Sequence, residues 1–281
     1  MAWLTTRFEL DLSHPIVMGI VNVTPDSFSD GGRYSDLSGA LRHAEQLLAQ
    51  GADILDVGGE ATRPGAPPVS EADELARLMP FLREAVRWHV PISVDTYKAG
   101  VMREVLALGV DIVNDIWALR QPGAQAVVAG HPSCGVCLMH MHREPQSMQL
   151  EPMTGDVLLQ VRTFLAQRAA ELVGQGVAPS RLVLDPGVGF GKTVPQNLSL
   201  LARQGEWRVP GYPVLAGWSR KSTLGQVLAK EGLVPAPGDR VDASVAAALM
   251  SVERGAHVVR VHDVKPTVDA LKVWQAVRQQ C

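Results

Sequence analysis

The sequence predicts an α/β protein of the (β/α)8 TIM-barrel class, organised as a single domain over residues 1–281. Three observations lead to this prediction. Short runs of apolar, mostly β-branched residues alternate with amphipathic helical patterns along the whole chain. These runs are almost continuously apolar, as strands are when both faces of a parallel sheet are covered. The length of 281 residues is close to the roughly 250 residues typical of such barrels.

The expected helices carry apolar residues at intervals of three and four, which places them on one face. The clearest of these helical segments are 37–50, 71–88, 157–173 and 242–254. Gly51, Gly109 and Gly255 each stand between a helix and the next strand, where a left-handed residue commonly ends a helix. The expected strands, in chain order, are 15–23, 52–58, 91–96, 110–116, 135–140, 181–186, 212–217 and 257–262.

An open, doubly wound sheet is the alternative arrangement of alternating strands and helices. Such a sheet usually carries a glycine-rich nucleotide-binding turn near its start, and the first expected strand is followed by no such turn. The glycine-rich segment 187–193 comes much later, and its spacing fits neither a phosphate-binding loop nor a dinucleotide fingerprint. We interpret it as a glycine turn that approaches neighbouring backbone closely beside a site.

Composition excludes several classes of protein. With 46% hydrophobic residues and a net charge of -3, the chain is not of the disordered class. Because 26 basic residues face 29 acidic ones, we expect no nucleic-acid partner. We also expect no membrane span and no signal peptide, since no apolar run approaches about 20 residues. Three cysteines form no disulfide framework, which favours a cytoplasmic location.

Nearly every expected strand ends at a side chain that forms hydrogen bonds. In a barrel of this class the carboxyl ends of the strands build the active site, so these side chains should meet in one polar cavity. Some of them would only satisfy loop backbone. The strand-end residues, with those just beyond, are Asn22, Asp56, Glu60, Asp95, Asn114, His140, Asp185, Ser219, Lys221, Arg260 and His262.

The acidic and amide groups among them suit a flat heterocycle. Carboxylates accept hydrogen bonds from N–H groups and an amide both donates and accepts, so Asp95, Asn114 and Asp185 fit a guanine-like or pterin-like ring. The alternative is local structure: Asp185 could form a turn before Pro186, and Asn114 with Asp115 could form an Asx turn.

The basic groups suit a phosphate or diphosphate, which Arg binds through two hydrogen bonds and Lys as a point charge. They converge from three loops, and the alternative for Arg220 with Lys221 is a solvated pair at a helix start. Asn22 could hold a hydrated Mg²⁺ that bridges diphosphate oxygens. The basic and hydroxyl groups are Thr62, Arg63, Ser219, Arg220, Lys221, Ser222, Arg260 and His262.

Two further patterns give weaker signals. Segments 24–32 and 60–68 are rich in Gly, Pro and polar residues, as mobile lids are, although plain surface loops have the same composition. Cys134 and Cys137 have C-x-x-C spacing, but Cys137 lies within an apolar strand and a second pair is missing from the sequence, so we expect packing rather than metal or redox chemistry. His140 and His142 lack an obvious third metal ligand.

Motifs along nearly the whole chain resemble those of the dihydropteroate synthase family. They are MGIVNVTPDSFSDGG (18–32), DVGGEATRPGA (56–66), SVDTYK (93–98), NDI (114–116), LMHM (138–141), LDPGVGFGK (184–192), SRKS (219–222) and RVHDV (260–264). The resemblance implies a TIM-barrel transferase of folate biosynthesis. It would condense 6-hydroxymethyl-7,8-dihydropterin diphosphate with 4-aminobenzoate to give 7,8-dihydropteroate and diphosphate, and sulfonamides would occupy its aminobenzoate site.

The resemblance also implies roles for individual residues. The catalytic residues would be Asp95, Lys221 and Arg63, and Asn22 would bind Mg²⁺. The substrate-binding residues would be Thr62, Arg63, Pro64, Asp95, Asn114, Asp185, Phe190, Gly217, Lys221, Ser222, Arg260 and His262. Family members are usually homodimers, which here would use the later helices.

The chain departs from the family pattern at His142 and Arg143 after the fifth strand, at Tyr97 and at Ala61. Two alternatives share the pterin pocket: a methyltransferase that passes a methyl group from methyltetrahydrofolate to a corrinoid protein, and a non-catalytic pterin-binding paralogue. The first has no need of Arg63 and the 219–222 loop. The second predicts damage to the lids or to Lys221, whereas both are intact.

Overall fold

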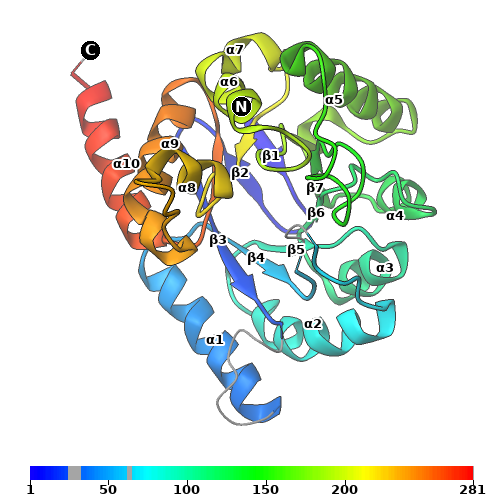
Figure 1. The fold of residues 1–281 in the computed structure, drawn as a ribbon. Coiled ribbons are helices and arrows are strands. Elements are labelled where there is room, and N and C mark those ends of the chain that lie inside the picture. The colour runs from blue at the N-terminus through cyan, green and yellow to red at the C-terminus, as the bar shows by residue number, and fades with distance from the viewer. Residues whose placement is uncertain (25–32, 62–64, 281) are drawn as a thin grey trace.

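Eight parallel strands form a barrel that is surrounded by helices (Figure 1). The structure, a computed structural model, describes residues 1–24, 33–61 and 65–280, with the backbone alone for 33–36. The strand order is β8-β7-β6-β5-β4-β3-β10-β9. A parallel bridge between Leu184 of β8 and Val214, just before β9, joins the two edges. The predicted (β/α)8 fold class is therefore confirmed.

Each barrel strand lies within the range expected from the sequence. The strands are β3 (Ile16–Asn22), β4 (Ile54–Gly58), β5 (Ile92–Asp95), β6 (Ile112–Asp115), β7 (Gly135–Met139), β8 (Leu182–Asp185), β9 (Leu215–Ala216) and β10 (Val258–Val261). The helices between and after them are α1 (Arg33–Ala49), α2 (Glu71–Ala85), α3 (Ala99–Leu108), α4 (Ala124–Gly130), α5 (Val157–Gly174), α6 (Val194–Ala202), α7 (Gln204–Trp207), α8 (Ser222–Leu228), α9 (Val241–Glu253) and α10 (Val264–Arg278). None of the described helices has the length and apolar character needed to cross a membrane.

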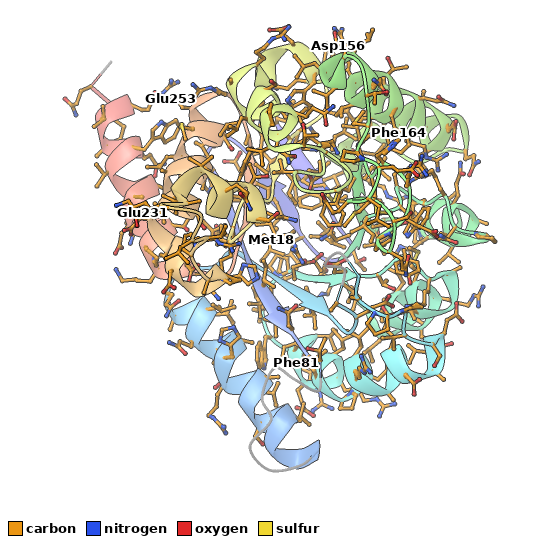
Figure 2. All side chains as sticks on the ribbon, in the orientation of Figure 1. Met18, Phe81, Asp156, Phe164, Glu231 and Glu253 are labelled. Atoms are coloured by element: carbon orange, nitrogen blue, oxygen red, sulfur yellow. The ribbon has the colours of Figure 1, made fainter. Side chains whose placement is uncertain are left out.

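The interior of the barrel is built in layers along its axis. An apolar layer fills the half of the barrel at the amino-terminal ends of the strands, which we call the lower half. Met18 lies at the centre of this layer (Figure 2). Because side chains alternate between the two faces of a strand, the residue two positions later points into the same interior, one layer higher. The apolar layer consists of Ile16, Met18, Ile54, Ile112, Cys137, Val183, Leu215 and Val258.

A hairpin that we did not predict closes the bottom of the barrel. Strands β1 (Ala2–Leu4) and β2 (Glu9–Asp11) pair antiparallel, and Trp3 in β1 is fully buried with the apolar layer. The Trp3 indole N–H donates to the Arg181 carbonyl oxygen at 2.9 Å. Both strands have three residues, which is too short for the alternation that reveals longer strands in a sequence.

Candidate active site

Polar side chains form the layer directly above the apolar one. Two residues after Ile54, Ile112, Val183 and Val258 come Asp56, Asn114, Asp185 and Arg260. The strand register aligns Gly58 of β4 with Asp95 of β5, and Asp95 with Asn114 of β6. The same periodicity that fills the lower half with hydrocarbon thus directs these polar groups into the upper half.

Arg260 joins two carboxylates at the centre of this layer. Its guanidinium donates to Asp56 Oδ2 at 2.6 Å and to Asp95 Oδ2 at 2.8 Å. Asp56 also accepts hydrogen bonds from the Ser93 hydroxyl at 2.6 Å and the Asn114 amide at 3.2 Å. Asp56 is fully buried and saturated with partners, so its role is to hold Arg260 and Asn114 in place.

Asp95 differs from Asp56 because only one of its two carboxylate oxygens forms a hydrogen bond within the described residues. Oδ1 of Asp95 is buried and has no hydrogen-bond partner among the described residues. Burial raises the pKa of Asp95 to about 7, and the nearby Asp56 carboxylate adds to that rise while Arg260 opposes it. A buried acceptor of this kind is satisfied when a ligand brings an N–H group to it.

Asp185 and the neighbouring pair on β6 show which strand-end groups serve local structure. Asp185 Oδ1 accepts the Gly187 N–H at 2.7 Å, so the expected turn exists, yet the residue also lines the cavity. Burial raises the pKa of Asp185. On β6 the roles divide: Asp115 accepts the N–H groups of Trp117 and Leu119, both at 2.7 Å, as in an Asx turn, whereas Asn114 faces the cavity.

Lys221 stands at the upper edge of the cavity beside an aromatic ring. It precedes the first residue of α8, and its Nζ lies 4.2 Å from the centre of the Phe190 ring. Burial and, to a smaller extent, the charge of Arg260 lower the pKa of Lys221 to about 8. The ammonium and the ring together form a cationic, aromatic corner of the cavity that Asp185 also lines.

Two further basic residues carry different charge states. The His262 backbone N–H donates to Ser219 Oγ at 3.1 Å, and Oγ lies 3.0 Å from His262 Nδ1. Burial and Arg260 lower the pKa of His262 to about 3, so the ring is neutral at physiological pH. The guanidinium of Arg220 makes two hydrogen bonds to Asp263, at 2.9 and 2.6 Å, and this charge is balanced within the protein.

One cavity of about 800 Å³ collects all the described residues to which the family resemblance assigns a catalytic, substrate-binding or metal-binding role. That volume suits a small organic ligand. Thr62, Arg63 and Pro64 lie outside the described residues. The candidates that line the cavity are Asn22, Asp95, Asn114, Asp185, Phe190, Gly217, Lys221, Ser222, Arg260 and His262.

Asn22 is the candidate metal ligand among them. It is the last residue of β3, it is exposed, and it lines the cavity. Nowhere among the described residues do three or more His, Cys, Asp or Glu side chains gather to hold a metal ion. A single amide oxygen beside a cavity with basic residues fits Mg²⁺, which takes few protein ligands and completes its shell with water and phosphate oxygens.

A buried ionic cluster anchors the start of the second expected lid. The Lys98 ammonium pairs with both Glu60 and Glu74, and the Tyr97 hydroxyl donates to Glu60 at 3.0 Å. Tyr97, which departs from the family pattern, therefore supports the loop that leaves β4. Arg77 of α2 donates to the Gly59 carbonyl at 2.9 Å and lines the cavity.

Sequence reasoning missed Arg77 because it lies within a helix rather than at a strand end. It also missed the role of Lys192, which is buried against loop carbonyls. His140, expected at the cavity, is buried outside the cavity lining and contacts Lys192. Cys134 and Cys137 are buried free cysteines, and burial raises the pKa of both thiols.

Comparisons with known proteins point to one family. Residues 18–262 match the model described as "Pterin binding enzyme". The chain is 51% identical over 280 residues to a dihydropteroate synthase of Neisseria meningitidis serogroup B, covering 98% of this chain and 97% of that protein.

Two solved structures are also similar. A Burkholderia cenocepacia dihydropteroate synthase complexed with 7,8-dihydropteroate has a TM-score of 0.90 and 51% identity, and the match covers 99% of this chain and 97% of that one. A Yersinia pestis dihydropteroate synthase with a sulfonamide drug complex has a TM-score of 0.91 and 44% identity, over 99% of this chain and 100% of that one.

Proposed function

The chain belongs to the dihydropteroate synthases of the pterin-binding enzyme family, and from this membership we propose how its residues carry out that reaction. The enzyme joins 6-hydroxymethyl-7,8-dihydropterin diphosphate to 4-aminobenzoate and releases diphosphate. The whole chain, 1–281, acts as one domain. The observation that carries the proposal is the unpartnered Asp95 Oδ1, among the described residues, in a cavity that also presents Lys221 and Arg260.

The pterin ring binds in the polar layer. Asp95 and Asp185 accept its N–H groups, and Asn114, held by Asp56, meets a ring edge with its amide. Arg260 stacks on the ring while its own charge is balanced by the two carboxylates. Gly217 leaves room above Asp185, since a side-chain Cβ at that position would come 3.9 Å from Asp185 Oδ2.

The basic rim receives the diphosphate. Lys221 offers an ammonium, and neutral His262 presents its Nε2–H, because Nδ1 faces the Ser219 hydroxyl. Mg²⁺ held by Asn22 would neutralise charge on the leaving diphosphate. The C–O bond breaks first, with the electron pair leaving on the diphosphate oxygen, and the Asp95 carboxylate stabilises the resulting pterin methylene cation.

The 4-aminobenzoate then attacks as a neutral amine. Its nitrogen forms the C–N bond to the methylene carbon and loses a proton to solvent, so a strong general base is not required. Phe190, Lys221 and Ser222 line its site, and the family resemblance adds Thr62, Arg63 and Pro64. Support for this placement comes from the Lys221–Phe190 corner, which offers a cation and an aromatic face to an aryl carboxylate.

A diphosphate-release assay tests the proposed function. Diphosphate should appear when the enzyme, pterin diphosphate and Mg²⁺ are combined with 4-aminobenzoate, and a chelator should stop the release until Mg²⁺ is restored. Release that does not depend on the arylamine, or methyl transfer to a corrinoid partner, would contradict the proposal.

The Asn22→Ala variant tests the metal ligand. Loss of one protein oxygen should raise the Mg²⁺ concentration needed for half-maximal activity by about ten-fold, while the KM for 4-aminobenzoate at saturating Mg²⁺ stays close to that of the wild type. Activity would be titrated against Mg²⁺ for both proteins. Superimposable titration curves would remove Asn22 from the metal site.

We further propose a homodimer and a cytoplasmic location. Helices α8, α9 and α10 lie together on one side of the barrel (Figure 1), and apolar side chains on and between them are exposed. Such a surface is typical of subunit contacts. Free, buried cysteines are consistent with a reducing compartment. The exposed residues are Val227, Leu228, Leu233, Val234, Met250, Val273 and Val277.

A further inference from the structure

Lys192 is a buried basic residue that lies outside the cavity lining, and the proposed reaction does not use it. Its side chain lies just after the glycine-rich turn, and the residue is 2% exposed. Four acceptors surround Nζ, and none of them is a carboxylate: the carbonyl oxygens of Gly187 at 2.9 Å, Phe190 at 3.1 Å and His140 at 3.3 Å, and His140 Nδ1 at 2.9 Å. Burial lowers the pKa of Lys192 to about 7, and the surrounding acceptors favour the ammonium form because they replace its water.

The acceptors come from two separate parts of the chain, which Lys192 joins. Gly187 and Phe190 belong to the loop after β8, whereas His140 follows β7. The loop backbone approaches this segment so closely that a Cβ at Gly187 would lie 1.8 Å from the His140 carbonyl oxygen. Gly187, with a φ of +66°, therefore has to be glycine, and the expected close-approach turn is present.

The N–H and carbonyl groups of Gly189 are held by side chains from outside the loop. Asn197 Oδ1 accepts the Gly189 N–H at 2.9 Å, and Gln149 donates to the Gly189 carbonyl at 2.6 Å. On the inner side, Lys192 holds the Phe190 carbonyl. The Phe190 ring is thereby fixed at its own backbone and faces the Lys221 ammonium 4.2 Å away.

We propose that Lys192 is a positioning residue for the 4-aminobenzoate half of the site, because its ammonium ties the Phe190 loop to the end of β7 and sets where the Phe190 ring stands against Lys221. This inference rests on the proposed binding of 4-aminobenzoate at Phe190. Lys192 does not line the cavity, so it acts through Phe190. His140 complements it as an acceptor, since burial lowers the pKa of His140 to about 2 and keeps the ring neutral.

The Lys192→Met variant tests this role. It keeps most of the side-chain volume but removes the ammonium. We expect the KM for 4-aminobenzoate to rise about ten-fold or more, because small displacements of positioning groups are expensive. The dissociation constant of the pterin diphosphate, measured by calorimetry with Mg²⁺, should stay within about two-fold of the wild type. If Lys192→Met does not fold, Lys192→Gln, which keeps an N–H donor without the charge, carries the same comparison.

Arg181→Met is the matched control. Arg181 is also a buried cation that donates to carbonyl oxygens, those of Cys134 at 2.7 Å and Val128 at 3.1 Å, but it precedes β8 at the opposite end of the barrel. Its loss should lower stability and leave the KM for 4-aminobenzoate unchanged. Equal KM shifts in the Arg181 and Lys192 variants would show a general loss of stability and overturn the inference.

A double-mutant cycle separates this inference from the proposed function. If Lys192 acts through Phe190, adding Lys192→Met to Phe190→Ala should raise the KM for 4-aminobenzoate no further than Phe190→Ala alone. Independent, multiplying effects would overturn the positioning role, as would an unchanged KM in the Lys192 variant. An unchanged KM in Phe190→Ala would instead refute the proposed aminobenzoate placement.

Discussion

Replacing Asp95 with Asn should reduce kcat by about a hundred-fold to a thousand-fold while the affinity for the pterin diphosphate changes far less. The amide has nearly the same size as the carboxylate and can still hydrogen-bond to the ring and to Arg260. What it lacks is the negative charge, whose main effect on the substrate comes when the methylene cation forms. Steady-state diphosphate release would give kcat, and calorimetry would give the dissociation constant. Equal losses of kcat and of affinity for the pterin diphosphate would contradict the proposed role of Asp95 in stabilising the cation.

The same variant should change the pH profile. Burial raises the pKa of Asp95 to about 7, and only the anion stabilises the cation. Activity of the wild type should therefore rise with pH as Asp95 loses its proton around pH 7. The Asp95→Asn variant has no carboxyl group to titrate at this position, so its residual activity should lack this rise.

Asp115→Asn provides the control for that variant. Asp115 is fully buried on the adjacent strand, and burial raises its pKa to about 7 as well, but it holds backbone N–H groups outside the cavity lining. Its replacement should cost stability and leave the acid limb of the pH profile in place. An identical kcat loss in the two variants would argue that both act through folding.

Replacing Arg260 with Met should lower the free energy of unfolding by about 3–5 kcal/mol at neutral pH, because two buried carboxylates then lose their counter-charge. Asp56 is 0% exposed and Asp95 8% exposed, so water replaces the guanidinium only poorly. Urea unfolding followed by tryptophan fluorescence would measure the loss.

The sign of the pH dependence follows from proton uptake. In the folded Arg260→Met variant the uncompensated carboxylates bind protons more readily than in the unfolded chain, so its stability falls as pH rises. The gap between variant and wild type should therefore shrink as the pH is lowered from about 8 to about 5.

Arg220→Met is the matched control for Arg260. Arg220 also makes two hydrogen bonds, but both go to Asp263. Its side chain is 34% exposed and that of Asp263 14%, against 22% for Arg260 and 0% for Asp56, and partly exposed ion pairs contribute about 1 kcal/mol or less. Two results would contradict the interpretation of Arg260 as the counter-charge of two buried carboxylates. One is an equal loss of unfolding free energy in the Arg220 and Arg260 variants, and the other is a difference between the Arg260 variant and the wild type that does not change with pH.

The strands and the polar layer could be predicted from the sequence because one periodicity produces both. A strand that alternates inward and outward gives Ile112 and Asn114 the same direction, and the change from apolar to polar marks the height at which the site begins. The N-terminal hairpin could not be predicted, because three-residue strands carry no such alternation.

Partners far apart in the chain limited the prediction of individual roles. Arg220 had the composition of an anion site, but its charge is taken up by Asp263, 43 residues later. Asp56 had the same strand-end signature as Asp95, and only the contacts of Arg260, Ser93 and Asn114 reveal that it is saturated. In the sequence, Lys192 belongs to a segment whose spacing fits no phosphate-binding motif. Its acceptors are mainly backbone carbonyls, which a sequence does not distinguish, so its role could not be predicted.

The apolar layer and the polar layer of the barrel interior meet different requirements: the first stabilises the fold and the second carries out the reaction. Substitutions among the hydrocarbon residues around Met18 alter heat tolerance without touching a substrate. An inhibitor that mimics a substrate contacts the residues that line the cavity, and among these Asp95, Arg260 and Lys221 also take part in catalysis. Escape from such a compound must therefore arise around the cavity, close to groups that the reaction itself needs, whereas thermal adaptation can proceed in the apolar layer, away from the substrates.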